Sequence, residues 1–172
     1  SEMASARAAQ ELLLPVRSDS HGLFTWSVSA SPGLEVAGDL VDIAPTDDGG
    51  LGLMVGDVAG KGARAGIVMA SIQAYAHAIR EKGGTPTDLL EALDGWAKDV
   101  VPEDLFVTLW CARLSPDGRI DWVDAGHGMS YRVRASGELV RMGGPHRPPV
   151  GVAPAVVEME TMQLEKGGSL VI

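Results

Sequence analysis

The sequence predicts an α+β domain in which two central helices lie between groups of antiparallel strands. Its 172 residues are 45% hydrophobic, which is enough to bury one sizeable core. Apolar residues recur at helical spacing from 67 to 79 and again after Pro86, whereas the flanking segments alternate and are bounded by turn residues. We therefore expect a single domain with helices in the middle and strands on either side.

The N-terminal part combines a short helix with the first strands. Residues 1–16 are expected to form a linker helix that Pro15 ends, because the apolar residues before it have helical spacing. Residues 23–29 alternate as a first strand, which we expect to pair with residues 35–43 across a Ser-Pro-Gly turn. The latter segment is in turn expected to neighbour a buried strand at residues 51–55.

Glycines and capping residues set the limits of the two helices. The first helix follows the glycine-rich turn 56–62, and a pair of glycines ends it. Thr85, Pro86 and Asp88 then provide an N-cap, a first-turn proline and a capping acid. The second helix should therefore begin there and run to about residue 100.

Beyond residue 104 the pattern changes to short strands. Clusters of Gly, Pro, Ser and Asp separate apolar or alternating runs, which is typical of hairpins. The expected strands are 106–114 with 120–125, 131–134 with 139–142, and then 156–164 and 169–172. Residues 143–154 contain too much Pro and Gly for regular structure, so we expect a loop there.

The stretch 51–70 is the centre of the predicted domain because it joins a buried strand to a helix through a glycine-rich turn. Such turns often bind phosphate, and Lys61 would suit that interpretation. However, GDVAGKG is one residue short of the phosphate-loop motif, and Gly62 stands where the metal-binding hydroxyl would be. A bare Asp57 carboxylate would also repel phosphate unless a divalent cation lay between them. The turn therefore favours a metal site over a nucleotide loop.

A second acid, Asp39, lies on the preceding predicted strand. If strands 36–43 and 51–55 are antiparallel neighbours, Asp39 and Asp57 end at the same edge of the sheet. Carboxylates that converge in this way suit a hard divalent cation. Spacing alone does not decide the matter, because Asp39 and Asp42 also fit ordinary strand-edge acids in an acidic chain.

Five blocks of sequence carry a resemblance to a known family. In order they are AGDLVDI, GDVAGKGARAGIVMA, DLFVTLWCARL, DWVDAGHGMSYRV and GGPHRPPVGV. Over about residues 34–172 the chain resembles the bacterial PP2C-type (PPM) serine/threonine phosphatases of the SpoIIE and RsbU kind. The segment ARAAQELLLPV is also similar to the helix that commonly leads into such domains.

The resemblance implies a four-layer αββα sandwich of two antiparallel sheets flanked by helices. Residues 17–172 would form the phosphatase domain, and residues 1–16 its N-terminal linker helix. The apolar run 169–172 stops without a turn or a polar tail, whereas the family continues into a Thr-Asp-Gly segment and a later Asp that supply further metal ligands. The C-terminal part of the domain is therefore expected to be missing.

The family's roles carry over to three residues of this sequence. Asp39 matches the first metal acid, Asp57 matches the acid that bridges two metals, and Val58 matches a main-chain carbonyl ligand. The two acids are accordingly the catalytic candidates. Hard oxygen donors suit Mn²⁺ or Mg²⁺, whereas zinc would require a His or Cys cluster that the scattered histidines do not offer. Two such ions would activate a hydroxide for attack on phosphorus without a phosphoenzyme.

Four other residues are weaker candidates. His127 falls on a motif position of the family and fits either an acid near the metal or a structural histidine at a strand end. Asp42 fits a contact to the site through water as well as a turn-stabilising acid. Lys61 and Arg64 fit either attraction of a substrate phosphate or ordinary solvated cations. No substrate-binding residue can be assigned from the sequence.

Composition excludes several classes of partner. The net charge of −9 argues against nucleic acid and against an anionic membrane, both of which require a basic surface. No apolar stretch approaches the length of a membrane span, and the N-terminus lacks a secretory pattern, so a cytoplasmic location is expected. Cys111 lies in an apolar run and is interpreted as a buried strand residue, while Asp121 and Asp124 are interpreted as exposed strand acids.

Two functional hypotheses follow. The first is a metal-dependent protein serine/threonine phosphatase that hydrolyses phosphoserine or phosphothreonine on a regulatory protein, which the resemblance suggests is an anti-sigma factor antagonist. The second is a non-catalytic regulatory or docking domain of the same fold, suggested by the missing C-terminal acids. The N-terminal helix is also a candidate contact for a homodimer, although it is short for a coiled coil.

Overall fold

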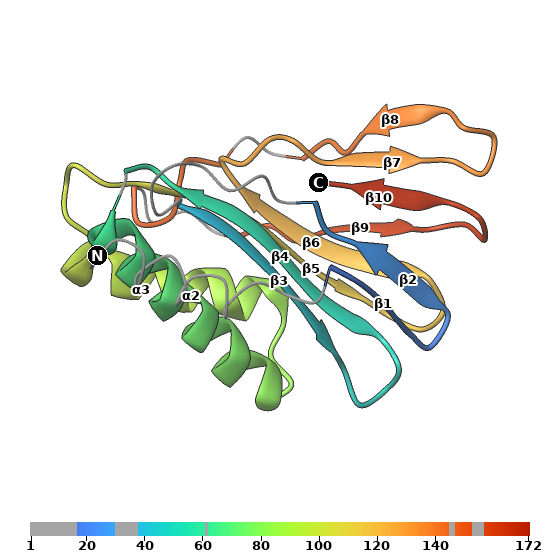
Figure 1. Cartoon of the computed structure of the whole chain (residues 1–172), viewed down its shortest axis with the longest axis horizontal. Coiled ribbons are helices and arrows are strands. Elements are labelled where there is room, and N and C mark those ends of the chain that lie inside the picture. Colours follow the sequence, from blue (N-terminus) through green and yellow to red (C-terminus); the bar gives the residue numbers. More distant parts are fainter. Residues whose placement is uncertain (1–16, 30–37, 61, 145–146, 153–156) are drawn as a thin grey trace.

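The fold consists of two layers of antiparallel strands, one of which is covered by two helices (Figure 1). The structure is a computed structural model that describes residues 17–29, 38–60, 62–144, 147–152 and 157–172. The predicted linker helix 1–16, and the homodimer contact assigned to it, lie outside these residues. The predicted α+β class with two antiparallel sheets and flanking helices is confirmed.

A five-stranded antiparallel sheet forms the centre of the molecule. Its strands, in spatial order, are β3 (Asp39–Pro45), β4 (Leu51–Val58), β5 (Val107–Leu114), β6 (Arg119–Ala125) and β9 (Glu160–Gln163). Tight turns join β3 to β4 and β5 to β6, as their turn residues predict. Within the described residues β3 is therefore an edge strand, and β4 lies between β3 and β5.

Two helices cover one face of this sheet (Figure 1). Helix α2 (Ala63–Glu81) follows the glycine-rich turn, and α3 (Pro86–Val100) follows the predicted cap. The Thr85 hydroxyl accepts from the Asp88 amide, and the Asp88 carboxylate accepts from the Thr85 amide at 2.7 Å, which forms a capping box. The prediction for the second helix is confirmed at both ends. None of the described helices combines the length and apolar character that a membrane span requires.

The second layer of strands lies against the other face of the central sheet (Figure 1). It contains a three-stranded sheet in the order β10 (Ser169–Val171), β7 (Tyr131–Val133) and β8 (Leu139–Arg141), and a hairpin of β1 (Ser18–His21) and β2 (Phe24–Ser27). Of the four predicted layers, the described residues form two strand layers and one helical layer.

The predicted pairing of the first strand is wrong. Residues 24–27 pair with β1, not with β3. The turn between them consists of Gly22, which has a φ of 58°, and Leu23. Because glycine adopts this left-handed conformation without strain, two residues suffice to reverse the chain. The Ser-Pro-Gly segment after this strand has a stronger turn signal than the single glycine before it, so the sequence favoured the wrong partner.

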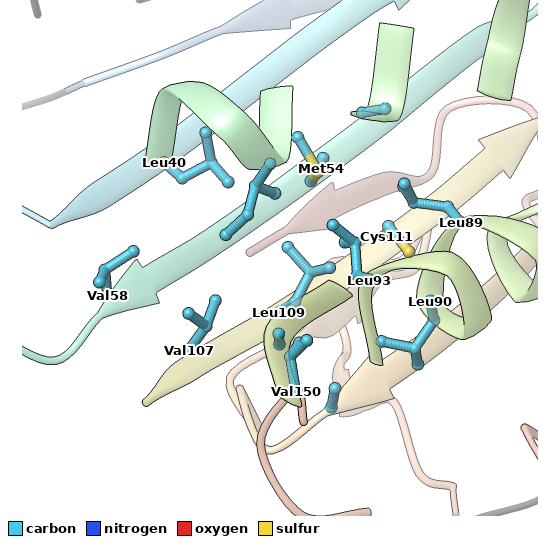
Figure 2. Close-up of a cluster of buried hydrophobic side chains, with 14 of the residues drawn as sticks. Leu40, Met54, Val58, Leu89, Leu90, Leu93, Val107, Leu109, Cys111 and Val150 are labelled. Atoms are coloured by element: carbon cyan, nitrogen blue, oxygen red, sulfur yellow. The ribbon is translucent and has the colours of Figure 1, made fainter. Parts of the chain in front are cut away.

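Two apolar clusters bury the two faces of the central sheet. Figure 2 shows the cluster between the sheet and the helices, which includes Leu40, Met54, Val58, Leu89, Leu90, Leu93, Val107, Leu109, Cys111 and Val150. The cluster between the strand layers includes Leu51, Trp110, Leu114, Ile120 and Trp122, with Phe24 and Trp26 packed against it. Each large side chain buried in this way contributes roughly 1.5–3 kcal/mol. Both faces of the sheet therefore stabilise the fold.

The capping box at the start of α3 provides a first test of this description. Thr85→Ala removes the acceptor for the Asp88 amide, so it should lower the free energy of unfolding by about 1 kcal/mol. Thr87→Ala, two residues further along the same helix, has no such bond and serves as the control. Urea unfolding followed by circular dichroism measures both, and equal stabilities of the two variants would contradict the assignment of the cap.

Candidate metal centre

The candidate centre begins with two carboxylates that lie opposite each other on adjacent strands. Asp39 is the first residue of β3 and pairs directly with Asp57 of β4. Directly opposed residues in an antiparallel pair have Cβ atoms about 4.5–5.5 Å apart, and like charges there destabilise the pair. Both side chains are exposed, and neither forms an ion pair with any residue in the described part of the chain. The fold thus concentrates negative charge at this end of the sheet.

Strand alternation places both acids on the face that looks toward the second strand layer. Leu40 and Val58, their immediate neighbours, belong to the cluster beneath the helices. Because successive side chains point to opposite faces, Asp39 and Asp57 lie on the other face, where Thr108 of β5 is the next residue across. The acids are therefore separated by the sheet from the helix-side core.

The electrostatic surroundings of Asp57 are unfavourable for an isolated carboxylate. Although Asp57 is exposed, partial loss of hydration is the largest cause that raises its pKa above the ordinary value, and the neighbouring Asp39 charge raises it further. The charge of His127 acts in the opposite direction and lowers it. A cation between the two acids would relieve both their mutual repulsion and the loss of hydration.

A glycine lets the two strands approach closely beside the acids. The Val58 amide donates to the Gly38 carbonyl at 3.0 Å. A Cβ atom on Gly38 would lie 2.1 Å from the Val58 carbonyl oxygen and 2.9 Å from Oδ1 of Asp57. No side chain fits there. Gly38 therefore leaves these two oxygens unobstructed beside Asp39, an arrangement that the sequence signalled only by a glycine before the first acid.

The turn after β4 leads directly into α2. Gly60 and Gly62 have φ values of 134° and 82°, which residues with a side chain rarely adopt. The Ala59 amide donates to the Phe106 carbonyl at 2.8 Å and fixes the start of the turn. Arg64, a candidate for phosphate attraction, instead makes an exposed two-point ion pair with Asp104. Lys61 lies outside the described residues.

These donors fit a hard divalent cation. Two carboxylates and one main-chain carbonyl offer only oxygen, which Mg²⁺ and Mn²⁺ prefer over the nitrogen and sulfur ligands typical of zinc. In the described ranges no three His, Cys, Asp or Glu side chains gather closely enough to hold a metal by themselves. The pair Asp39 and Asp57 therefore supplies part of a ligand set.

The loop after β6 brings His127 to the same end of the sheet. Gly126 bridges to Leu109, which lies next to Thr108 on β5. The Asp124 carboxylate accepts from the His127 amide at 2.8 Å and from the Gly128 amide at 3.0 Å. Asp124 is therefore the residue that shapes this loop, a role that its interpretation as an exposed strand acid missed.

Asp42 lies away from the acid pair. It is three residues from Asp39 on β3, so it lies on the opposite face, where its carboxylate pairs with Arg80 of α2 at 2.6 Å. A Cβ atom on Gly52 would be 2.6 Å from Arg80 Cδ, so this glycine makes room for the arginine stem. Asp42 thus attaches a helix to the sheet and makes no contact with the candidate centre.

Burial and side-chain pairing test the interpretations of Cys111 and Asp121. Cys111 is buried as expected, and burial raises the pKa of its thiol to about 12, so the thiolate is not accessible at neutral pH. Asp121 lies on the predicted strand, but its expected exposure is wrong: its side chain is only 14% exposed, because it pairs with Arg119 and accepts from the Thr161 hydroxyl at 2.6 Å. Both residues therefore act in the structure of the sheet.

Comparison with known families identifies the chain. A family model described as Stage II sporulation protein E (SpoIIE) matches residues 47–172, which is more than half of the sequence. The chain belongs to the SpoIIE family. The family resemblance predicted from the sequence blocks is thereby confirmed, and the site described above lies in a SpoIIE-type phosphatase fold.

Solved structures share this fold. The RsbU and RsbW domains of Rv1364c from Mycobacterium tuberculosis are 26% identical with a TM-score of 0.71, over 83% of this chain and 40% of that one. The PP2C phosphatase domain and a fragment of the regulatory domain of SpoIIE from Bacillus subtilis are 20% identical with a TM-score of 0.67, over 80% and 41%. RsbX in complex with magnesium is 18% identical with a TM-score of 0.66, over 80% and 66%.

The SpoIIE-family chain spans only part of these neighbours. It covers 40% and 41% of the mycobacterial and Bacillus subtilis chains. A comparison with curated proteins found no significant match. The comparisons therefore establish the family and the fold, and the activity, substrate and partners of this chain are matters for proposal.

The close approach at Gly38 leads to a prediction about the geometry of the acids. Gly38→Ala places a methyl group against the Val58 carbonyl, so β3 and β4 must separate, at a cost on the order of 1–3 kcal/mol in the free energy of unfolding. Gly95→Ala on α3 meets open space and should instead stabilise the chain slightly. Denaturant unfolding compares them, and a Gly38→Ala variant as stable as the parent chain would contradict the close approach.

The raised pKa of Asp57 leads to a prediction about pH. A raised folded-state pKa means that the protonated carboxyl favours the fold, a contribution that is present at low pH and is lost as the pH rises through the folded-state pKa. Asp57→Asn should therefore raise the melting temperature of the metal-free chain at neutral pH, with a difference that shrinks below about pH 4.

Asp88→Asn serves as a control, because its effect on stability at neutral pH should have the opposite sign. Hydrogen bonds from Thr85 lower the pKa of Asp88, so its charge favours the fold at neutral pH and that contribution is lost as the pH falls. The substitution should destabilise the chain at neutral pH and do so less in acid. Calorimetric melting across the pH range checks both variants, and a destabilising Asp57→Asn at neutral pH would contradict the raised pKa of Asp57.

Proposed function

We propose that this chain belongs to a metal-dependent protein serine/threonine phosphatase, with Asp39 and Asp57 as its catalytic acids. The observation that carries the proposal is the direct opposition of these two carboxylates in a SpoIIE-family fold. A protein has little reason to hold like charges together unless a cation neutralises them. The raised pKa of Asp57 supports the same conclusion, because it reflects first a loss of hydration and then repulsion from Asp39, and a bound cation would offset both.

The proposed metal ligands are the Asp39 and Asp57 carboxylates and the Val58 main-chain carbonyl. All three lie beside Gly38, where a side chain would collide with the Val58 carbonyl oxygen and with Oδ1 of Asp57. Mn²⁺ or Mg²⁺ fits these oxygen donors, and magnesium is present in the RsbX neighbour. When bound, two such ions supply a water molecule of lowered pKa for attack on a phosphoryl group. The Asp39 and Asp57 carboxylates and the Val58 carbonyl would hold the ions at this end of the sheet, on the face away from the helix-side core.

The proposed substrate is a phosphoserine or phosphothreonine protein, specifically an anti-sigma factor antagonist. The support comes from the family and from the neighbours, which include an RsbU domain joined to an RsbW domain and a protein of the bacterial stressosome. The net charge of −9 makes nucleic acid an unsuitable partner. A homodimer through residues 1–16 stays a prediction.

Metal binding tests the proposal directly. Titration of the 172-residue chain with Mn²⁺ in a calorimeter should show binding, and Asp39→Asn or Asp57→Asn should weaken it by ~10-fold or more because each removes a charged ligand. Asp99→Asn, an exposed acid on α3, makes the same change in net charge and should bind Mn²⁺ as the parent chain does.

Hydrolysis of a phosphoserine protein with Mn²⁺ is the accompanying functional measurement. Turnover should fall together with Mn²⁺ affinity in Asp39→Asn and Asp57→Asn. Equal turnover in these variants and the parent chain would exclude the proposed catalytic role. A folded chain that binds no Mn²⁺ but does bind a protein partner would instead favour the regulatory or docking alternative.

A further inference from the structure

A buried ion pair joins helix α3 to the loop before β9. Asp94 lies on α3 and is 7% exposed, and the Arg147 side chain is 9% exposed. Arg147 Nη2 donates to Asp94 Oδ2. The other carboxylate oxygen accepts from the Gly151 amide at 2.9 Å. One helix acid therefore binds both ends of the segment 147–151.

Within the described part of the chain, the arginine pairs with this one carboxylate. Nε and Nη1 of Arg147 are buried and have no hydrogen-bond partner among the described residues. Burying an arginine and a carboxylate costs desolvation that the pair only partly recovers, so such pairs are weak evidence for stability. In some proteins such a pair instead fixes one arrangement of the chain among several. Here the pair would fix the segment 147–151 relative to its neighbours.

The segment lies across the ends of two central strands. Arg147 bridges to Ala125, the last residue of β6, and Val150 bridges to Val107, the first residue of β5. The Val150 amide donates to the Val107 carbonyl at 2.9 Å. A Cβ atom on Gly126 would lie 3.2 Å from the Pro149 nitrogen, so the segment also packs on the residue before His127.

Both strand ends lead directly to the acid pair. Val107 pairs with Val58 of β4, and Figure 2 shows Val58, Val107 and Val150 at the same end of the helix-side cluster. Val58 follows Asp57 in the chain. On the other strand, Gly126 bridges to Leu109, which follows Thr108 opposite Asp57, and Gly126 is followed by His127. An unbroken series of contacts thus runs from the buried pair to the candidate metal centre.

We propose that Asp94 and Arg147 are positioning residues that hold the ends of β5 and β6 in the arrangement that the metal centre requires. The inference rests on the proposed function, because it concerns the same centre. The pair touches neither the metal nor the substrate. It acts through Val107, which sets the position of Val58, and through Gly126, which sets the position of His127. The directional two-point bonding of Asp94 gives a placement that apolar contacts alone do not define.

The test compares substitutions in the buried pair with a substitution in a more exposed ion pair elsewhere on β5. Arg147→Met removes the charge with little change in length, Arg147→Lys keeps the charge, and Asp94→Asn keeps an acceptor oxygen for the Gly151 amide. Arg113→Met is the control, because Arg113 pairs with Asp48 at 2.7 Å near the opposite end of β5. Each variant of the full 172-residue chain is titrated with Mn²⁺ at a temperature where it remains folded.

Arg147→Met and Asp94→Asn should weaken Mn²⁺ binding about 10-fold, the lower end of the range for residues that support metal ligands. In the metal-free chain, the amide resonances of Val58, Val107 and His127 should move in these variants. Arg147→Lys should recover most of the affinity, since an ammonium group can still reach Asp94. Arg113→Met should change neither the affinity nor those resonances.

Mn²⁺ affinity within about twofold of the parent chain in both Arg147→Met and Asp94→Asn would overturn the inference while leaving the proposed function intact. Equal losses in Arg147→Lys and Arg147→Met would overturn it as well. A parent chain that binds no Mn²⁺ would overturn the proposed function and this inference together. If Arg147→Met fails to fold, Asp94→Asn decides by the same titration.

Discussion

Two like charges lie opposite each other across β3 and β4, and the rest of this end of the molecule must overcome their repulsion. The antiparallel register fixes Asp39 against Asp57, and side-chain alternation places both on one face. A register slip of one residue would turn the acids toward the apolar cluster beneath the helices. The many leucine, valine and methionine contacts of that cluster therefore hold the carboxylates together against their repulsion.

Residues around the acid pair fix the positions of the neighbouring strands and loop. Gly38 permits the close approach of the strands, and Asp124 shapes the loop that carries His127. On the far side of the sheet, Asp42 and Arg80 attach α2 to the same edge strand that begins with Asp39. The centre is thus built mainly on strand ends and short bonded loops, which hold side chains more rigidly than a long loop does.

The sequence predicted the elements whose signals are local. The capping residues of α3, the hairpin β5–β6 and the alternation of β4 could all be recognised within a few neighbouring residues. The β1–β2 hairpin was missed because a single glycine makes its turn. The acid pair was anticipated because both acids end adjacent strands joined by a short turn.

Residues that depend on distant partners could not be recognised in this way. Asp94 resembles an ordinary helix acid in the sequence, and its partner Arg147 is 53 residues away. The role of Asp94 is therefore set by how the chain folds back on itself, which no local pattern records. Asp124 differs, because the amides that it accepts from belong to His127 and Gly128, only three and four residues away. Its place in an alternating strand concealed this local turn.

The position of β3 at the edge of the described sheet has a further consequence. An edge strand exposes unpaired main-chain groups that can recruit a strand from another molecule, and charged side chains are a common protection against this. Asp39 lies on β3 with an exposed carboxylate. The same charge that suits a cation therefore also disfavours pairing of this edge with another molecule, and neutralising it would weaken both properties at once.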